Sequence, residues 1–188
     1  MKLRIGIKKE AIISEYRNIF NNTDISYITK GAPIDFHEFM MGFLKFQADL
    51  VVKRINEVVR RQLYNWSPLS KSWIEFKKKH KLDPRTWYAS GMVLKSIHYW
   101  YTPVADDYFV GVHPTKRHPG YGKGKGRGAR IYDIIRWLEA GTPKMPARPL
   151  FTKVFQEFAT QKMQTKLYQD YIRSSKSIII DKRINSQL

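Results

Sequence analysis

The chain has 188 residues, of which 34 are Lys or Arg and 16 are Asp or Glu, so its net charge is +18. This charge attracts nucleic acids, acidic membrane surfaces or acidic proteins, and does not choose among them. Because 43% of the residues are apolar and 14% are aromatic, a chain disordered throughout is excluded. The sequence has no Cys, which excludes disulfides, thiolate nucleophiles and Cys-ligated zinc.

Residues 1–33 are expected to form an N-terminal arm. Leu3, Ile5 and Ile7 alternate with cations and Gly, as in a half-buried strand, and a short helix is expected over residues 9–20. Charged residues interrupt the apolar ones, so no signal peptide is expected. No run approaches the roughly 18 apolar residues of a membrane span, and we expect a soluble protein made in the cytoplasm.

A long amphipathic helix is predicted over residues 36–64. Asp35 is a suitable N-cap, and Glu38 stands three positions later, as in a capping box. Apolar residues then recur at steps of three and four, which places them on one helix face: Phe36, Met40, Phe43, Leu44, Val51, Ile55, Val58, Val59 and Leu63.

A short basic helix is predicted over residues 70–80, with Ser70 as its N-cap. Cations and aromatic residues mix there, namely Lys71, Lys77, Lys78, Lys79, Lys81 and Arg85 with Trp73, Trp87 and Tyr88. Such a mixture can bind single-stranded nucleic acid by stacking. We favour the alternative in which Trp73 and Phe76 form a buried helix face and the lysines are solvated.

An antiparallel hairpin is predicted next. A capped helical turn over residues 90–97 leads into two segments, 97–102 and 107–113, that are rich in aromatic and β-branched residues. The residues from Pro103 to Asp106 are expected to form the turn.

Residues 114–130 form a basic loop rich in Gly. Six cations in it are candidate contacts for nucleic acid or a protein partner: Lys116, Arg117, Lys123, Lys125, Arg127 and Arg130. The spacing of the glycines does not match a P-loop, and no Ser or Thr follows. Two interpretations stay open: contact with a phosphate backbone without sequence readout, or a solvated loop that orders against another subunit.

The C-terminal third is predicted to be mainly helical. A helix over residues 131–140 is ended by Gly141, and Pro143, Pro146 and Pro149 impose an extended connection. A second long helix follows over residues 150–173. The tail, residues 174–188, either contains a strand at Ile178-Ile179-Ile180 or orders only against a neighbour.

Signals for catalysis are nearly absent. The five histidines are scattered, and no carboxylate stands near His113 and His118 to complete a metal site. Asp106 and Asp107 are adjacent and mark the hairpin turn. No Gly-x-Ser-x-Gly elbow occurs. We expect no catalytic residue, no metal and no cofactor.

Five short motifs occur in a fixed order along residues 36–160. They are Trp66-Ser67-Pro68-Leu69-Ser70, Ser90-Gly91-Met92-Val93-Leu94-Lys95-Ser96-Ile97, Val110-Gly111, Glu139-Ala140-Gly141-Thr142 and Pro146-Ala147-Arg148-Pro149-Leu150. In this order they resemble the phage virion-morphogenesis and tail-completion proteins. The second motif departs from the family pattern by Ser90 in place of Thr and one extra residue before Leu94. The basic loop stands where the family often has a shorter connection, and the tail beyond residue 173 has no counterpart in the family.

The resemblance implies a non-enzymatic structural protein of a tailed phage. Members of that family complete or join the head-proximal end of the tail, the neck, usually as a ring, here expected to be a hexamer. The implied partners are other copies of the chain, adjacent neck, tail-terminator or connector proteins and the DNA in the channel, but no membrane. The implied location is the virion, assembled in the host cytoplasm.

The motif residues are expected to be structural or to lie at subunit contacts: Trp66, Pro68, Leu69, Ser90, Gly91, Gly141, Pro146, Arg148 and Pro149. Two prolines hold Arg148 in an extended segment, where its donor fork can pair with a carboxylate or with backbone carbonyls. Whether this pairing lies at a subunit contact or within the chain stays open.

We therefore expect an α+β fold, a small antiparallel sheet packed against two long amphipathic helices. Residues 34–173 would form the tail-completion-like domain, with the basic loop inserted at 114–130, between the N-terminal arm (1–33) and the C-terminal tail (174–188). The alternative function is sequence-independent binding of nucleic acid, which rests on the net charge and the loop. A nuclease is a third hypothesis, since separated carboxylates could converge in the fold.

Overall fold

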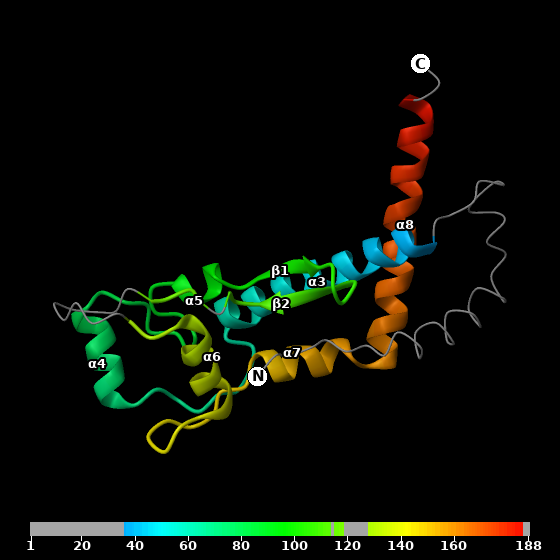
Figure 1. Ribbon diagram of the computed structural model, residues 1–188. Helices are drawn as coiled ribbons and strands as arrows, with labels where there is room; N and C mark the ends of the chain where they lie inside the picture. The colour runs from blue at the N-terminus through cyan, green and yellow to red at the C-terminus, as the bar shows by residue number, and fades with distance from the viewer. Residues whose placement is uncertain (1–35, 114, 119–127, 186–188) are drawn as a thin grey trace. The chain divides into compact units, whose positions relative to one another are not determined.

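The computed structural model describes the backbone of residues 36–113, 115–118 and 128–185, and the side chains of residues 40–113, 115–118 and 128–174 (Figure 1). The predicted strand and helix of residues 1–33, the cap formed by Asp35 and Glu38, and the loop cations Lys123, Lys125 and Arg127 lie outside these residues.

The described chain is α+β, with a two-stranded antiparallel sheet and several helices. In chain order these are α3 (Phe36–Arg61), α4 (Lys71–Lys79), α5 (Met92–Lys95), β1 (His98–Thr102), β2 (Asp107–Gly111), α6 (Ile131–Ala140), α7 (Phe151–Phe158) and α8 (Gln161–Asn185). By their contacts the described residues form two compact units. Residues 36–47 and 157–185 form unit 1, and Ala48–Gln156 form unit 2.

Unit 1 contains a close contact between α3 and α8. The Phe43 side chain is fully buried, and its ring meets the edge of the Tyr168 ring at a centroid distance of 5.8 Å. The Gln47 Nε2 donates to Gln164 Oε1 at 2.7 Å. A Cβ atom at Gly42 would overlap the hydroxyl of Tyr171, so the absence of a side chain at Gly42 lets this ring lie where it does against α3.

The predicted helix over residues 150–173 is two helices, and this correction has a local cause. The Thr160 hydroxyl accepts a hydrogen bond from Met163 N at 3.4 Å, as an N-cap does, so α8 starts anew after α7 ends. The backbone of Ile178-Ile179-Ile180 lies within α8, so the strand considered there is wrong.

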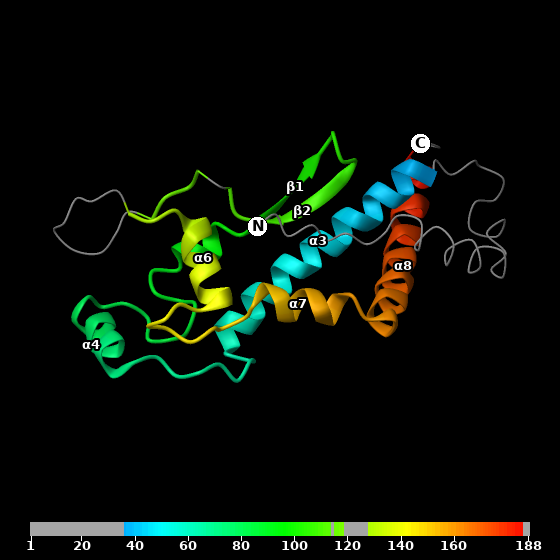
Figure 2. The ribbon, with the colours of Figure 1, turned by 60° about the horizontal axis from the view of Figure 1, so that its bottom comes forward.

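Unit 2 has its core on the second half of α3. Five residues of one α3 face are buried: Ala48, Val51, Ile55, Val58 and Val59. Figures 1 and 2 show the β1–β2 hairpin running alongside this half of α3. Trp100 pairs with Phe109 in the register of the two strands, and Val110 is buried. Further core residues come from the segments that follow: Leu94, Ile97, Ile131, Ile135, Leu150, Phe151 and Val154.

Most predicted elements of unit 2 are confirmed. The Ser70 hydroxyl accepts from Trp73 N at the start of α4, and Gly141 ends α6 with a φ of 76°. Helix α3 ends at Arg61 rather than at residue 64, because Gln62 adopts a φ of 51° and leaves the helical region. The connection after α6 is extended only in part. Thr142 and Met145 exchange two backbone hydrogen bonds, so a tight turn surrounds Pro143.

In the part of the chain that the structure describes, no helix combines the length and the apolar character that crossing a bilayer requires.

Candidate functional site

The Arg148 side chain connects two of the sequence motifs inside unit 2. It is 2% exposed, and its Nε and Nη2 donate to the carbonyls of Ser67 and Pro68, both at 3.0 Å. The Nη1 donates to Pro146 O at 3.3 Å. Burial lowers the pKa of the guanidinium. Of the two alternatives, Arg148 therefore pairs with backbone carbonyls, and these belong to its own chain.

Two indole groups fix the same segment from other directions. Trp66 Nε1 donates to Pro149 O at 3.0 Å, and the buried Trp87 donates from Nε1 to Arg148 O at 2.9 Å. The Arg148 amide itself donates to Leu138 O at 2.7 Å. We call Trp66, Ser67, Pro68, Trp87 and residues 146–149 the Arg148 clasp. Its bonds from residues 148 and 149 to residues 66–68 and 87 span 61 to 83 positions along the chain, so it fixes the tertiary structure of unit 2.

Glu139 caps the helix that follows the clasp. Its Oε1 accepts from the amides of Leu150 and Phe151, both at 2.6 Å, and its Oε2 accepts from the Thr152 hydroxyl at 3.0 Å. A carboxylate at a helix N-terminus satisfies amides that lack a helical partner and interacts favourably with the helix dipole. The sequence places Glu139 within a motif but does not indicate this role, because Phe151, the first residue of α7, lies 12 positions away along the chain.

The remaining motif residues also occupy structural positions. Gly91 is the N-cap of α5 with a φ of 75°, and the Ser90 hydroxyl accepts from Met92 N at 3.4 Å. The same hydroxyl lies 3.4 Å from Nε2 of His118, a buried residue whose pKa is lowered by burial. Leu69 is half-buried and leads into the cap of α4.

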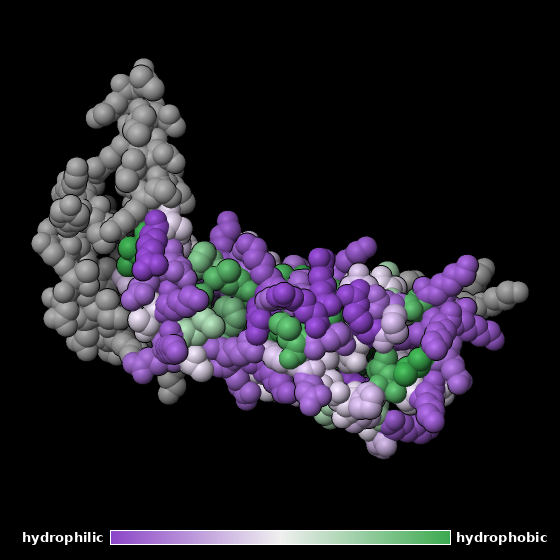
Figure 3. All heavy atoms as spheres, turned by 180° about the vertical axis from the view of Figure 1, so that it is seen from behind, coloured by the Kyte–Doolittle hydropathy of each residue, from purple (hydrophilic) through white to green (hydrophobic). Residues whose placement is uncertain are grey.

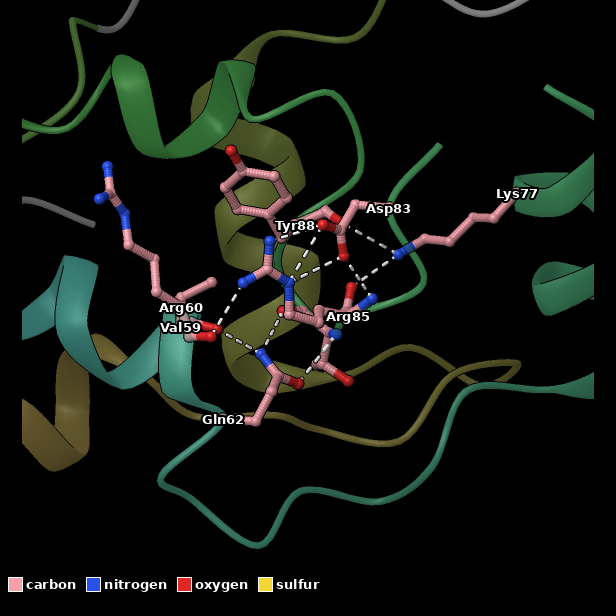
Figure 4. A network of polar contacts seen from close by, with 8 residues as sticks. Val59, Arg60, Gln62, Lys77, Asp83, Arg85 and Tyr88 are labelled. Atoms are coloured by element: carbon pink, nitrogen blue, oxygen red, sulfur yellow. Dashed lines mark hydrogen bonds and ion pairs between the residues drawn. The ribbon is translucent and has the colours of Figure 1, made fainter. Parts of the chain in front are cut away.

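A second polar network joins the end of α3 to α4 and to residues 83–88 (Figure 4). Arg85 forms a double contact with Asp83, including Nη2 to Oδ2 at 2.6 Å, and donates from Nη1 to Arg60 O at 2.9 Å. The hydrogen bond from Arg85 is the main reason that the pKa of Asp83 is lowered. Gln62 bonds both the amide and the carbonyl of Thr86. These contacts fix the loop that carries Trp87.

Lys77 is a buried cation within this second network. It is 2% exposed, and its Nζ donates to Arg85 O at 2.7 Å and to Tyr88 O at 3.2 Å. Burial lowers its pKa to about 8. Asp83 opposes this shift and the Arg148 charge adds to it, so the two networks interact electrostatically.

Raising the pH from 8 to 10 is expected to increase the free energy of unfolding by about 2 kcal/mol through Lys77. The folded-state pKa of about 8 lies below the ordinary value of 10.5, so the folded state binds fewer protons in this window. Urea denaturation of the wild type and of Lys77→Met at both pH values isolates the effect. Equal pH dependence in the two proteins would contradict it. Above pH 10 the buried Tyr168, whose pKa is raised to about 12, lowers stability instead.

Helix α4 departs from its predicted arrangement. Trp73 is 38% exposed and stacks on Phe76 with ring centroids 4.9 Å apart, whereas Lys77 is buried. The predicted buried Trp73–Phe76 face with solvated lysines is therefore wrong for Trp73 and for Lys77. Backbone carbonyls around Lys77 can satisfy its ammonium group, which periodicity alone does not reveal.

The described part of the basic loop is its stem. Arg117 and Arg130 face each other in a backbone bridge, and His118 N donates to Ala129 O at 3.0 Å. Lys116, Arg117 and Arg130 are all exposed. Arg130 forms an ion pair with Asp133 at 2.8 Å, and the charges of Arg136 and Arg117 also help to lower the pKa of Asp133. One carboxylate is thus surrounded by three guanidinium groups, which leaves the stem positive.

Among the residues with described side chains, no group of three or more His, Asp or Glu comes together in a way that could hold a metal ion. Compared with known protein families, with curated proteins and with solved structures, the chain matches none of them.

Proposed function

We propose that the chain is a structural, non-enzymatic virion protein of a tailed phage. It completes or joins the head-proximal end of the tail as a ring-forming subunit, expected to be a hexamer. Its partners are other copies and the adjacent neck, tail-terminator or connector proteins. The residue motifs described above carry the resemblance on which the proposal rests.

The Arg148 clasp is the observation that supports the proposal most. The first and last motifs, far apart in sequence, bind each other through Arg148, and Glu139 of the fourth motif caps α7 beside them. The motif residues thus act together as the frame of unit 2. A rigid frame that presents surfaces to neighbours suits an assembly protein, since specific interfaces need preorganised partners.

The proposal includes a finer picture of the fold. In it, the hairpin packs against the long helix α3, and the terminal arms and the basic loop contact neighbouring subunits. A head-to-tail contact between copies closes into a ring when its rotation divides a full turn.

Purified virions test the proposed function. The protein is expected in the particle, and an electron-dense label at its C-terminus is expected at the junction of head and tail. Light scattering of the purified chain or of neck complexes is expected to give the molar mass of a closed ring, six copies of the chain, rather than that of a monomer. Infectious particles that contain none of the protein would refute the proposal.

Sequence-independent binding of nucleic acid is the second candidate function. The positive stem at Lys116, Arg117 and Arg130 favours it, because phosphate contacts depend on clustered cations rather than on base readout. The two functions are compatible, since a neck ring surrounds the path of the DNA.

Replacing Lys116 and Arg117 together by Ala is expected to flatten the salt dependence of DNA binding. The plot of log K against log[salt] has a negative slope, and each lost phosphate contact reduces its magnitude by about 0.9. The loss of two contacts is therefore expected to reduce the magnitude by about 2. Fluorescence anisotropy at salt concentrations from about 50 to about 200 mM measures the slope. The matched control is Lys162→Ala with Lys166→Ala, two exposed lysines on α8. An unchanged slope in the stem variant excludes the stem as the contact.

A further inference from the structure

Helix α4 carries an exposed aromatic stripe surrounded by cations. Trp73 stacks on Phe76, and the Phe76 ring lies 4.2 Å from the His80 ring, so three rings follow one side of the helix. Exposed lysines flank the stripe at positions 71, 78, 79 and 81, and the helix contains one acid, Glu75. We call this surface the α4 stripe. A partner that covers it needs apolar atoms and negative charge.

The tip of the β1–β2 hairpin has the opposite character. Val104 is 99% exposed, and Asp106 and Asp107 follow it after Ala105. Residues 96–115 contain no Lys or Arg, the longest such stretch in a chain of net charge +18. The exposed Tyr101 donates its hydroxyl hydrogen to Asp106 at 2.9 Å, which orients the carboxylate beside an aromatic ring. The tip is therefore acidic, aromatic and apolar.

The α4 stripe and the hairpin tip lie far apart within unit 2. Figures 1 and 2 both place α4 at one end of this unit and the turn between β1 and β2 at the other. Seen from behind, hydrophilic side chains cover most of the described surface, and hydrophobic ones appear in separate patches (Figure 3). Two complementary surfaces at opposite ends of a compact unit cannot satisfy each other within one copy.

We propose that the hairpin tip of one copy docks on the α4 stripe of the next copy. Val104 and Tyr101 then cover the Trp73–Phe76 stack, and the carboxylates of the tip lie among the α4 lysines. Opposite potentials favour this pairing and disfavour tip against tip or stripe against stripe. The contact joins different surfaces, so it is head-to-tail and propagates from copy to copy until a ring closes. This inference rests on the proposed ring and names its subunit contact.

Cross-linking tests the contact directly, because the chain has no Cys of its own. Val104→Cys and Lys78→Cys both replace exposed side chains, so both variants are expected to fold. When the two proteins are mixed with a short bismaleimide, a cross-linked dimer containing one of each is expected. A single protein with both substitutions is expected to give a series of cross-linked oligomers, and the largest of them contains as many copies as the ring. The control mixture of Val104→Cys with Lys162→Cys is expected to give no cross-link.

Charge exchange tests the electrostatic part of the contact. Val104→Lys puts a cation at the tip and is expected to weaken self-association at least about tenfold, whereas Val104→Ser has a smaller effect. Lys78→Glu with Lys79→Glu is expected to weaken it similarly. A protein that combines Val104→Lys with Lys78→Glu and Lys79→Glu is expected to regain most of the lost self-association. Sedimentation velocity over a range of concentrations measures all four proteins.

Four outcomes overturn the contact. The first is a ring that forms without the mixed cross-link, which leaves the proposed function standing. The second is a cross-link between two Val104→Cys copies, which indicates a symmetric interface. The third is a helix variant that associates normally but loses binding to a single-stranded oligonucleotide, which assigns the α4 stripe to nucleic acid. A chain that stays monomeric without cross-links also contradicts the contact, while its presence in virions tests the proposed function separately.

Discussion

Arg148→Met is expected to lower the free energy of unfolding by about 3 to 5 kcal/mol, a large part of the stability of a domain of this size. The substitution removes the donors for the carbonyls of Ser67, Pro68 and Pro146 in a site where the side chain is 2% exposed. The three carbonyls lose the donor that they share, and the Met side chain offers no replacement. Urea denaturation followed by Trp fluorescence measures the change.

Arg148→Lys separates the geometry of the clasp from its charge. The ammonium group keeps the positive charge but lacks the planar fork that reaches Ser67 O and Pro68 O together. About half of the loss seen with Met is therefore expected. Arg136→Met, an exposed Arg of α6, is the matched control and is expected to change stability by less than about 0.5 kcal/mol. Equal stability of Arg148→Met and the control would refute the structural role of the clasp.

Gly141→Ala is expected to cost about 3 kcal/mol or more. The residue has a φ of 76° and a ψ of 179°, a conformation that is essentially restricted to Gly. A Cβ there would lie 2.8 Å from Ala147 N and 2.9 Å from Met145 O, and both are backbone atoms that cannot move without opening the turn. The same turn delivers Arg148 to the clasp, so the two changes are expected to be non-additive.

Gly111→Ala is the matched control for Gly141→Ala. A Cβ at Gly111 would make only an ordinary contact, 3.7 Å from the Trp100 ring. The exchange also removes the entropic cost of Gly in a strand, so its effect is expected to be within about 1 kcal/mol. Thermal unfolding of both variants measures the difference. A Gly141→Ala protein as stable as Gly111→Ala would mean that the turn has room for a side chain.

Elements whose signals are local could be predicted from the amino-acid sequence. The N-cap at Ser70, the helix stop at Gly141 and the turn between β1 and β2 follow from short-range preferences, and the structure has them where they were predicted. The α+β class also followed from the pattern. The division of the predicted C-terminal helix into α7 and α8 was missed, because one Thr hydroxyl among good helix formers is a weak signal.

The roles of the two buried cations, Lys77 and Arg148, depend on tertiary contacts in the fold. In sequence, Lys77 looked like its solvated neighbours, and Arg148 could bind its own chain or another. Their partners are backbone carbonyls, Arg85 O and Tyr88 O for Lys77, and Ser67 O and Pro68 O for Arg148. Every residue has a carbonyl, so sequence cannot indicate which one accepts. Burial of a cation depends on where the fold directs such oxygens, and local patterns carry no information on that.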